Sequence, residues 1–316
     1  MISVIIPTLN RQELLKKSIE AILNNSLLPD EILIIEQWNI EKTKESLFVF
    51  SSLLKIKNIK LVILSFQEKS ASKARNFWVS KASGDIIFFI DDDLEIDKYY
   101  IKLASEYLAQ NSDVKIVSGK DKNAKILKNS FLKQLIRVLT YQDIFWNKRI
   151  VLKNGQNIVK LDFENIVDSQ WASGTMVVKK EVFENFCFPK NFERWSYAED
   201  VFFSYQVFKK YWKWSVKFIS NLVFNHIKSD QNRISWASEI KMMIIYRYIF
   251  WKTSIYNNSF LNLILYIYWE FFRGLFIWKT KKWNFNFVFN TWKYLLKYYK
   301  EIDRSSINFN EFIFKK

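Results

Sequence analysis

The chain has 316 residues, of which 49% are apolar and 25% charged, so a disordered tail and a small disulfide-stapled scaffold are both excluded. Its net charge of +16 is uneven: residues 201–316 carry 19 Lys and Arg against 6 Asp and Glu, and the first 200 carry 29 against 26. A basic C-terminal third rich in aromatic residues suits an anionic membrane surface or a nucleic acid. The lone Cys187 excludes an intrachain disulfide. No basic, apolar leader follows Met1, so we expect a cytoplasmic protein.

The first half of the chain alternates short apolar runs with helical patterns, which predicts a doubly wound α/β fold with a mostly parallel sheet. Strands are predicted at residues 2–6, 31–35, 60–64 and 85–90, because these runs are rich in Ile and Val and apolar on both faces. Helices are predicted at residues 11–25, 41–54 and 70–82, and we expect Asn10 to cap the first of them.

The second half predicts a helix at 99–109, a strand at 114–118, a strand-like segment at 171–179 and helices at 180–186 and 198–211. Between them, residues 121–168 predict a helical excursion and a hairpin at Asn154–Gly155. Three long helices follow, at 238–253, 260–277 and 288–301. We therefore expect an α/β domain at 1–226 and a basic, aromatic-rich helical extension at 227–316.

The middle C-terminal helix is the most apolar segment of the chain. Glu270 and Arg273 interrupt it one turn apart, so we expect it to lie in a membrane interface or against a partner rather than to span a bilayer. An ordinary helical subdomain is an equally good interpretation of the same pattern.

Three adjacent carboxylates, Asp91, Asp92 and Asp93, follow directly on the predicted strand 85–90. In open α/β sheets, ligands bind beyond the carboxyl ends of strands. Because like charges repel unless a cation neutralises them, this position favours a divalent metal over a solvated acidic turn.

His226 and the Glu199–Asp200 pair are of residue types that could contribute to the same site. His226, the only histidine, closes a short apolar run, and its imidazole with two carboxylates would suit Mn²⁺ or Mg²⁺. Glu199 and Asp200 open a predicted helix, where acidic residues are favourable for structural reasons alone, although a carboxylate there could also act as a general base.

Taken in order, several segments resemble family 2 glycosyltransferases with the GT-A fold. They are the opening MISVIIPTLNR, SASKARN at 70–76, ASGD at 82–85, IDDD at 90–93, GTM at 174–176 with Lys180 and Phe183, the Glu199–Asp200 pair, and His226. The resemblance covers residues 1–226 and depends on the ordered set, since no single segment is specific.

The resemblance implies an inverting, metal-dependent transferase that moves a sugar from a nucleotide-diphospho-sugar to a hydroxyl of a glycan or lipid-linked acceptor. The residues implied to bind the nucleotide-sugar are Pro7, Thr8, Asn10, Glu36, Arg75, Asp91 and Asp92. Glu36 matches a family position that reads the base, and Arg75 would approach the diphosphate. Asp91, Asp93 and His226 would hold the Mn²⁺ or Mg²⁺. Asp200 would be the catalytic base, beside Glu199.

The chain departs from the family pattern at two places. Glu36 is followed by Gln37 rather than by a second acidic residue, and no Gln-x-x-Arg-Trp motif of processive synthases is present. Two other functions stay open. One is a sugar-phosphate nucleotidyltransferase, although Thr8–Arg11 is no glycine-rich phosphate loop. The other is a nonenzymatic, basic membrane or nucleic-acid binder, which would leave the carboxylates unexplained.

Tryptophan and glycine occur in unusual numbers, 13 against 5, where average usage predicts about 22 glycines. Several tryptophans stand where glycine is expected; they are Trp78, Trp171, Trp195, Trp212, Trp278 and Trp283. The codon UGA is read as tryptophan in some genetic codes and as glycine in some bacterial lineages. We hypothesise that many of these tryptophans are glycines in the natural protein, and UGG codons at 78, 195 and 212 would refute this.

Overall fold

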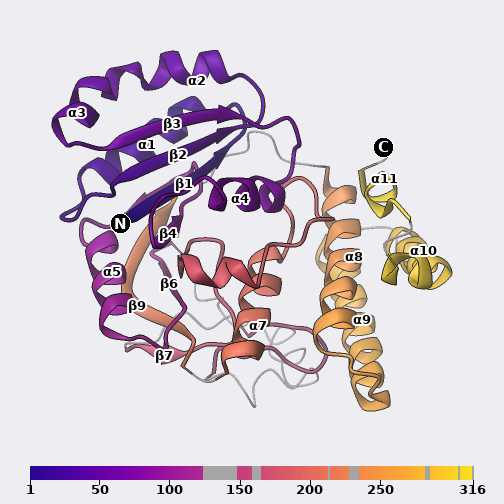
Figure 1. Ribbon diagram of the computed structural model, residues 1–316. Helices are drawn as coiled ribbons and strands as arrows, with labels where there is room; N and C mark the ends of the chain where they lie inside the picture. The colour runs from indigo at the N-terminus through magenta and orange to yellow at the C-terminus, as the bar shows by residue number, and fades with distance from the viewer. Residues whose placement is uncertain are drawn as a thin grey trace. The chain divides into compact units, whose positions relative to one another are not determined.

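The computed structural model describes residues 1–123, 148–158, 165–212, 214–227, 235–281, 285–304 and 307–314. The chain forms two compact units, whose elements are labelled in Figure 1. The first consists of Met1–Ile126 and Leu161–Asn232, and the second of Leu127–Lys160 and Arg233–Lys316. The second unit therefore includes residues 127–160 in addition to the C-terminal helices.

The N-terminal strands of the first unit form a parallel sheet, as predicted, and their order is β3-β2-β1-β4. Their bounds are β1 Ile2–Thr8, β2 Glu31–Glu36, β3 Lys60–Ser65 and β4 Ile86–Phe89. The connecting helices are α1 Gln12–Leu23, α2 Ile40–Leu47 with η1 Phe48–Phe50 and α3 Ser51–Ile56, and α4 Ala71–Val79. These helices confirm the three predicted from the apolar periodicity.

Beyond β4 the sheet becomes mixed, in the order β4-β8-β6-β9-β5 with β7 beside β9. In the described part of the chain, nine strands make this one sheet. The later strands are β5 Leu94–Ile96, β6 Ile116–Asp121, β7 Val167–Asp168, β8 Met176–Lys179 and β9 Val216–His226. Two helices lie among them, α5 Tyr100–Gln110 and α7 Glu199–Tyr211. The predicted strand 171–179 is shorter than expected, and the predicted helix 180–186 is the 3₁₀ turn η3, Lys180–Glu184.

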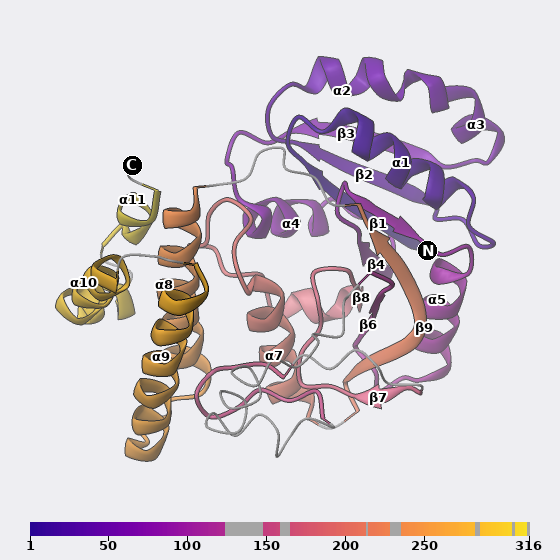
Figure 2. The ribbon, with the colours of Figure 1, turned by 180° about the vertical axis from the view of Figure 1, so that it is seen from behind.

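Helices cover both faces of the sheet in the first unit (Figures 1 and 2). Successive strand residues face opposite sides, so Val4 and Ile6 pack with α1 and α5 in one core while Ile5 packs with α4 and α7 in the other. This double burial is why the strands have no polar face, and it gives the doubly wound architecture expected from the sequence.

The predicted cap of α1 is wrong. The N-cap residue is Arg11, which makes no side-chain capping bond, and Asn10 stands just before it in a left-handed conformation with φ of 53°. Its backbone N–H donates to Glu36 Oε1 at 3.4 Å. Asn10 thus turns the chain after β1, a conformation that asparagine tolerates better than most residues.

The second unit consists mainly of helices. α8 Trp236–Ser254, α9 Phe260–Lys281 and α10 Phe285–Asp303 confirm the three predicted helices, and a short fourth, α11 Phe309–Phe314, was not predicted. The predicted hairpin is also present: Val151 pairs with Asn157 around Gly155, whose φ is +82°. Residues 124–147 of the predicted helical excursion lie outside the described residues. Within the described residues, no helix has the length and apolarity needed to cross a bilayer.

Backbone geometry bears on the tryptophan hypothesis at two positions. Trp212 ends α7, as expected for a C-cap, with φ of 63° and ψ of −157°, a conformation that is nearly exclusive to glycine. Trp214 has a φ of 76°, which also favours glycine, although Trp214 is not among the tryptophans expected to be glycine. Trp78, by contrast, lies on α4, and its side chain is buried in the core against the sheet. The side chain of Trp278 and all of Trp283 lie outside the described structure.

Replacing Trp212 by glycine is expected to raise the free energy of unfolding by about 1 kcal/mol. A non-glycine residue held in this conformation costs roughly 1–3 kcal/mol, which the glycine variant would regain. Part of this gain is offset, because glycine loses more backbone entropy on folding and because the stacking of Trp212 on Phe208 is lost. Urea unfolding measures the change. Trp212→Ala is the control, because alanine keeps the strain, and a glycine variant no more stable than the alanine variant would contradict the expectation.

Candidate active site

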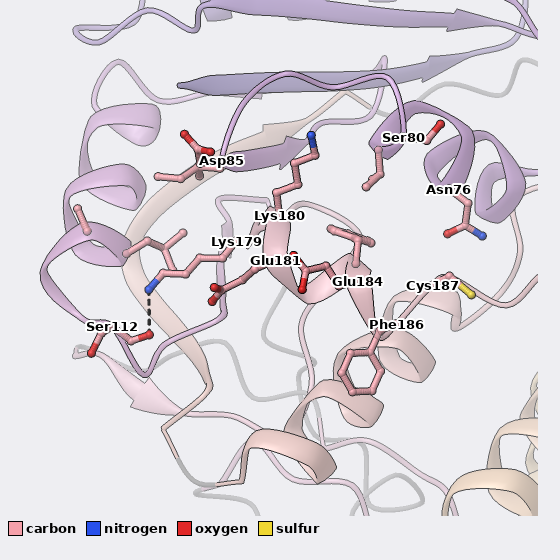
Figure 3. Close-up of a pocket in the computed structure, with 15 residues that line it drawn as sticks. Asn76, Ser80, Asp85, Ser112, Lys179, Lys180, Glu181, Glu184, Phe186 and Cys187 are labelled. Carbon is pink, nitrogen blue, oxygen red and sulfur yellow. Dashed lines mark hydrogen bonds between the residues drawn. The ribbon is translucent and has the colours of Figure 1, made fainter.

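A surface pocket of about 840 Å³ lies on the first unit at the beginning of β4, next to Asp85 (Figure 3). Its lysines are already engaged, since Lys180 Nζ donates to the carbonyl of Ala82 and Lys179 Nζ to that of Ser112. The three aspartates follow the opposite end of the same strand. The pocket therefore lies apart from the residues singled out in the sequence.

The triple aspartate lies where β4 ends, beside the end of its parallel neighbour β1. Thr8 Oγ1 donates to Asp92 Oδ2 at 2.7 Å, and Arg11 Nη1 lies 3.1 Å from Asp92 Oδ1 and 3.2 Å from Asp93 Oδ2. Burial raises the pKa of Asp92 to about 7, against the opposing effects of Arg11 and of the Thr8 hydrogen bond. Asp92 thus fastens β1 to β4.

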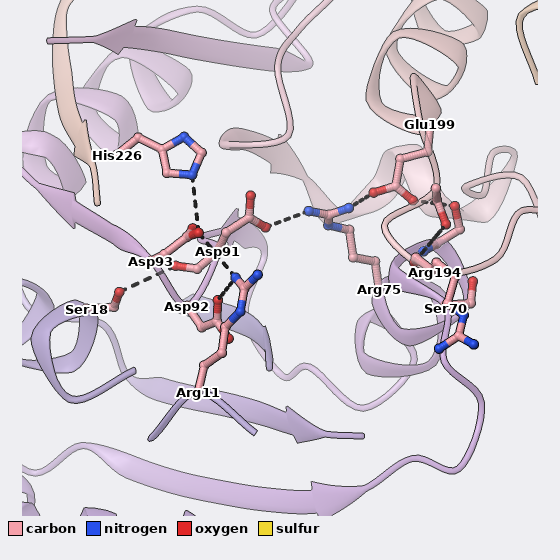
Figure 4. Close-up of polar contacts among 12 residues, drawn as sticks. Arg11, Ser18, Ser70, Arg75, Asp91, Asp92, Asp93, Arg194, Glu199 and His226 are labelled. Carbon is pink, nitrogen blue, oxygen red and sulfur yellow. Dashed lines mark hydrogen bonds and ion pairs between the residues drawn. The ribbon is translucent and has the colours of Figure 1, made fainter. Parts of the chain in front are cut away.

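His226 reaches the aspartates from a distant part of the sequence. It ends β9, which pairs with β5 so that His226 lies opposite Leu94, the residue after Asp93. Its Nε2 is 3.3 Å from Asp93 Oδ2 (Figure 4). The hydrogen bond to Asp93 raises the pKa of His226 above its ordinary value, and burial opposes this increase.

Arg75, on α4, lies between two carboxylates. Its Nη2 is 2.8 Å from Asp91 Oδ1, and its Nη1 pairs with Glu199 (Figure 4). Arg75 and Glu199 are both buried, whereas the Asp91 side chain is 38% exposed. Glu199 also accepts a hydrogen bond from the Ser72 hydroxyl. Glu199 is therefore held by α4, and its carboxylate is engaged inside the protein.

Asp200, next in the chain, faces a different space. Its Oδ1 accepts a hydrogen bond from the Val201 N–H at 2.8 Å. A Cβ built on Gly174 would lie 3.8 Å from Asp91 Oδ2, 4.0 Å from Asp200 Oδ2 and 3.6 Å from Arg75 Nη2. Since one point lies so close to all three groups, Asp91 and Asp200 border a common space that a larger residue 174 would enter. Burial raises the pKa of Asp200 above its ordinary value, and the bond from Val201 and the charge of Arg75 oppose this.

The loop before α7 determines where Glu199 and Asp200 lie. Arg194, Ser196 and Ala198 all have left-handed backbones, with φ of 57°, 51° and 61°. The loop is attached to the start of α4 through backbone groups: the N–H of Ala71 donates to the carbonyl of Arg194 at 2.8 Å, and the N–H of Arg194 donates to that of Lys69 at 2.6 Å. Left-handed residues other than glycine cluster at functional sites, where the surroundings must hold them.

The predicted base-reading residue, Glu36, is fully buried at the end of β2. Its Oε2 accepts from Thr43 Oγ1 at 2.5 Å, and its Oε1 accepts from the backbone N–H groups of Trp38 and Asn10 at 2.8 and 3.4 Å. Glu36 thus joins β2 to α2 and to the turn after β1. Of the other predicted nucleotide residues, Pro7 is half-buried in β1 and Asn10 is exposed.

The donor atoms of Asp91, Asp93 and His226 are of the kinds that Mn²⁺ accepts, namely carboxylate oxygen and imidazole nitrogen. Among the described residues, however, no group of three His, Cys, Asp or Glu side chains is arranged so that it could hold a metal ion. Two arginines pair with the carboxylates, Arg75 with Asp91 and Arg11 with Asp93. The ligand atoms of Asp91, Asp93 and His226 are therefore of types that suit a cation, and in this structure guanidinium groups neutralise the two carboxylates.

Sequence reasoning missed the contributions of Arg11 and Ser72. The order of the strands could have indicated Arg11, because it follows β1 and the ends of neighbouring parallel strands lie together. Nothing in the sequence pointed to Ser72, whose partner Glu199 lies 127 residues away.

The family model for glycosyl transferase family 2 matches residues 3–167, just over half of the chain. A curated relative, the GalNAc(5)-diNAcBac-PP-undecaprenol beta-1,3-glucosyltransferase of Campylobacter jejuni, is 33% identical over 96 residues. That alignment spans 30% of this chain and 30% of the relative, so it compares only part of the two proteins.

Solved structures share the fold at low sequence identity. The mannosyltransferase PcManGT from Pyrobaculum calidifontis, in complex with GDP-Man and Mn²⁺, is 14% identical with a TM-score of 0.54, over 94% of this chain and 75% of its own. Glucosyl-3-phosphoglycerate synthase from Mycobacterium tuberculosis is 15% identical with a TM-score of 0.53, over 81% and 80%. S. aureus TarS with UDP-GlcNAc is 16% identical with a TM-score of 0.52, over 79% and 66%. The first unit thus has the GT-A fold, and the chain belongs to glycosyl transferase family 2.

Proposed function

We propose that this chain is an inverting, metal-dependent glycosyltransferase that moves a sugar from a nucleotide-diphospho-sugar to an acceptor hydroxyl. One observation carries the proposal: Asp91 and Asp200 border the same space at the carboxyl end of β4, with His226 and Asp93 next to it. In a GT-A fold this edge of the sheet is the natural place for the donor. Family membership favours sugar transfer over nucleotidyl transfer.

Asp200 supplies the base in this proposal. Its Oδ1 is held by the Val201 N–H, which leaves Oδ2 turned toward Gly174 to accept the proton of the acceptor hydroxyl. The deprotonated oxygen attacks the anomeric carbon as the bond to the diphosphate breaks, so one displacement inverts the configuration. A raised pKa makes Asp200 a better proton acceptor than a solvated aspartate.

Asp91, Asp93 and His226 would hold the Mn²⁺ or Mg²⁺. A bound divalent cation stabilises the negative charge that develops on the diphosphate leaving group. Arg75, whose Nη2 borders the same space, would contact the phosphates directly. Pro7, Thr8, Asn10, Glu36 and Asp92 would shape the nucleotide end of the site from β1, β2 and the strand end after β4.

The relatives suggest the substrates to test. The structural neighbours were solved with UDP, UDP-GlcNAc or GDP-Man, and the curated relative acts on an undecaprenol-linked glycan. We propose a UDP- or GDP-sugar donor and a glycan or lipid-linked acceptor. Incubating the protein with a panel of UDP- and GDP-sugars and Mn²⁺ tests this: one donor should be hydrolysed or should protect against unfolding, and protection by none would contradict the proposal.

Chelation is expected to abolish transfer without unfolding the protein. EDTA should lower the transfer rate by about 100-fold or more, because leaving-group stabilisation by a cation is worth several kcal/mol, and Mn²⁺ should restore it. The protein should stay folded in EDTA, since Arg11 and Arg75 neutralise the aspartates when no cation is bound, and the urea midpoint should fall only by the contribution of cation binding. Full turnover in EDTA would refute the metal requirement.

The catalytic role is assigned to residues 1–226, and the basic region at 227–316 is proposed to act near the cytoplasmic face of the membrane. A lipid-linked acceptor would be found there, and the positive charge of this region would be attracted to anionic lipids. This location agrees with the lipid-linked substrate in the name of the curated relative.

A further inference from the structure

Over residues 260–274, where the side chains of α9 are described, the exposed side of the helix is apolar. Its large side chains Phe260, Leu261, Ile264, Ile267 and Phe271 are between 47% and 74% exposed. At the periodicity of a helix these five positions share one side, so they form a continuous stripe over about three turns. We call these five residues the α9 stripe. Apolar patches of this kind mark surfaces that bind a partner or a membrane.

The two charged side chains of α9 that the structure describes lie on the inward side of the helix. Glu270 and Arg273 pair with each other and are 1% and 8% exposed. Tyr266 and Trp269 are buried beside them on the same side. The pair that interrupts the apolar run in the sequence is therefore buried, and it does not interrupt the exposed face of the helix. A helix on a water-exposed surface has the opposite arrangement, with charges outward and apolar residues inward.

Charge indicates what covers the stripe. Residues 233–316 carry 14 Lys and Arg against 5 Asp and Glu, a surplus of nine positive charges. On α10 of the same unit, Lys293, Lys297 and Lys300 are exposed, and so are the apolar residues Phe289 and Leu296, at 57% and 69%. Lysines interleaved with apolar residues suit an anionic lipid surface, whereas a second copy of this basic region would be repelled.

We propose that the α9 stripe inserts into the interface of an anionic bilayer, with α9 lying in the membrane plane. A bilayer-spanning helix does not fit, because no described helix is long and apolar enough. The surface belongs to the second unit, and the proposal goes beyond the catalytic one without depending on it: membrane binding can succeed or fail whether or not sugar transfer occurs.

Vesicle co-sedimentation with the full chain is the first test. Vesicles of phosphatidylglycerol and phosphatidylcholine should bind the protein, and pure phosphatidylcholine should bind it at least about tenfold more weakly, since each lysine near an anionic surface contributes roughly fivefold. Leu261→Asp/Ile264→Asp should lower binding by about tenfold or more. Equal binding to both vesicle types, or unchanged binding by this variant, would overturn the proposal.

A matched control uses an apolar pair on the first unit. Phe48 and Val49 are 76% and 70% exposed, so Phe48→Asp/Val49→Asp adds the same two charges at a surface of similar exposure. This control should bind within about twofold of the parent. Equal loss in both variants would show that attachment is not specific to α9 and would overturn the assignment. Both variants should keep the parent's thermal unfolding midpoint, because all four positions are exposed.

A fluorescent probe tests insertion directly. Cys187 is exposed, so it is first replaced by serine, and Ile264→Cys is then labelled with an environment-sensitive dye. Anionic vesicles should shift the dye's emission to the blue. An unshifted dye on sedimented protein would place the stripe outside the bilayer and overturn the proposal. The proposal would also be overturned if analytical ultracentrifugation showed a dimer of the parent protein and the Leu261→Asp/Ile264→Asp variant were monomeric.

Discussion

Asp200→Asn is expected to lower kcat for sugar transfer by about 10²–10⁴-fold while leaving donor affinity nearly unchanged. Asparagine has a similar shape and can keep the contact of Oδ1 with the Val201 N–H, but it cannot accept the proton of the acceptor hydroxyl. Steady-state transfer assays and donor binding by calorimetry measure the two quantities. Normal turnover by this variant would refute the base assignment.

The pH profile provides a second readout for the same residue. Transfer needs the charged form of Asp200, and burial raises its pKa above the ordinary value of 3.8, so the rate should fall as the pH drops through that raised pKa. The residual rate of Asp200→Asn should lack this acid limb. Asp168→Asn is the control, because Asp168 is a half-exposed carboxylate paired with Lys217, and its profile should match the parent.

Arg75→Met is expected to cost about 3–5 kcal/mol of unfolding free energy and to abolish transfer. The substitution leaves the buried Glu199 and the neighbouring Asp91 without their shared guanidinium, and an uncompensated buried charge is strongly destabilising. Urea unfolding at neutral pH measures the loss. A change below about 1 kcal/mol would contradict the buried ion pair as described.

The double variant Arg75→Met/Glu199→Gln separates stability from function. Removing the charge of Glu199 should recover a large part of the stability lost by Arg75→Met, because the buried carboxylate is then neutral. Transfer should stay low, since Arg75 itself borders the donor space. Recovery of both stability and turnover would mean that Arg75 serves only to neutralise Glu199.

The apolar pattern of the sequence predicted the strands and helices of the first unit well, because burial on both faces leaves a clear signal in residues such as Val4 and Ile5. The position of the aspartates beyond β4 followed from the same reasoning. The proximity of His226 to Asp93 depends on the register of β9 against β5, which no local pattern encodes. The position of His226 at the end of an apolar run suggested that it belonged to this site, and the family resemblance implied the same grouping.

Polar contacts were harder to predict than the fold. The sequence indicated Asn10 as a cap, yet the turn after β1 uses its left-handed backbone and leaves Arg11 at the N-cap. Glu36 was expected to read the base, and its role in that reading stays a prediction, since its carboxylate is occupied by Thr43 and two backbone N–H groups. Such side-chain partners depend on three-dimensional packing, which propensity does not capture.

The loop ahead of α7 is joined to α4 by peptide groups, through the carbonyl and N–H of Arg194. Trp195, next to it, is 47% exposed. Because the main chain makes these attachments, the residue at 195 can be glycine, tryptophan or another type without moving Glu199 and Asp200 at the start of α7. Within two neighbouring residues, the chain thus combines a main-chain attachment that must be kept, at Arg194, with an outward position that can diversify, at 195.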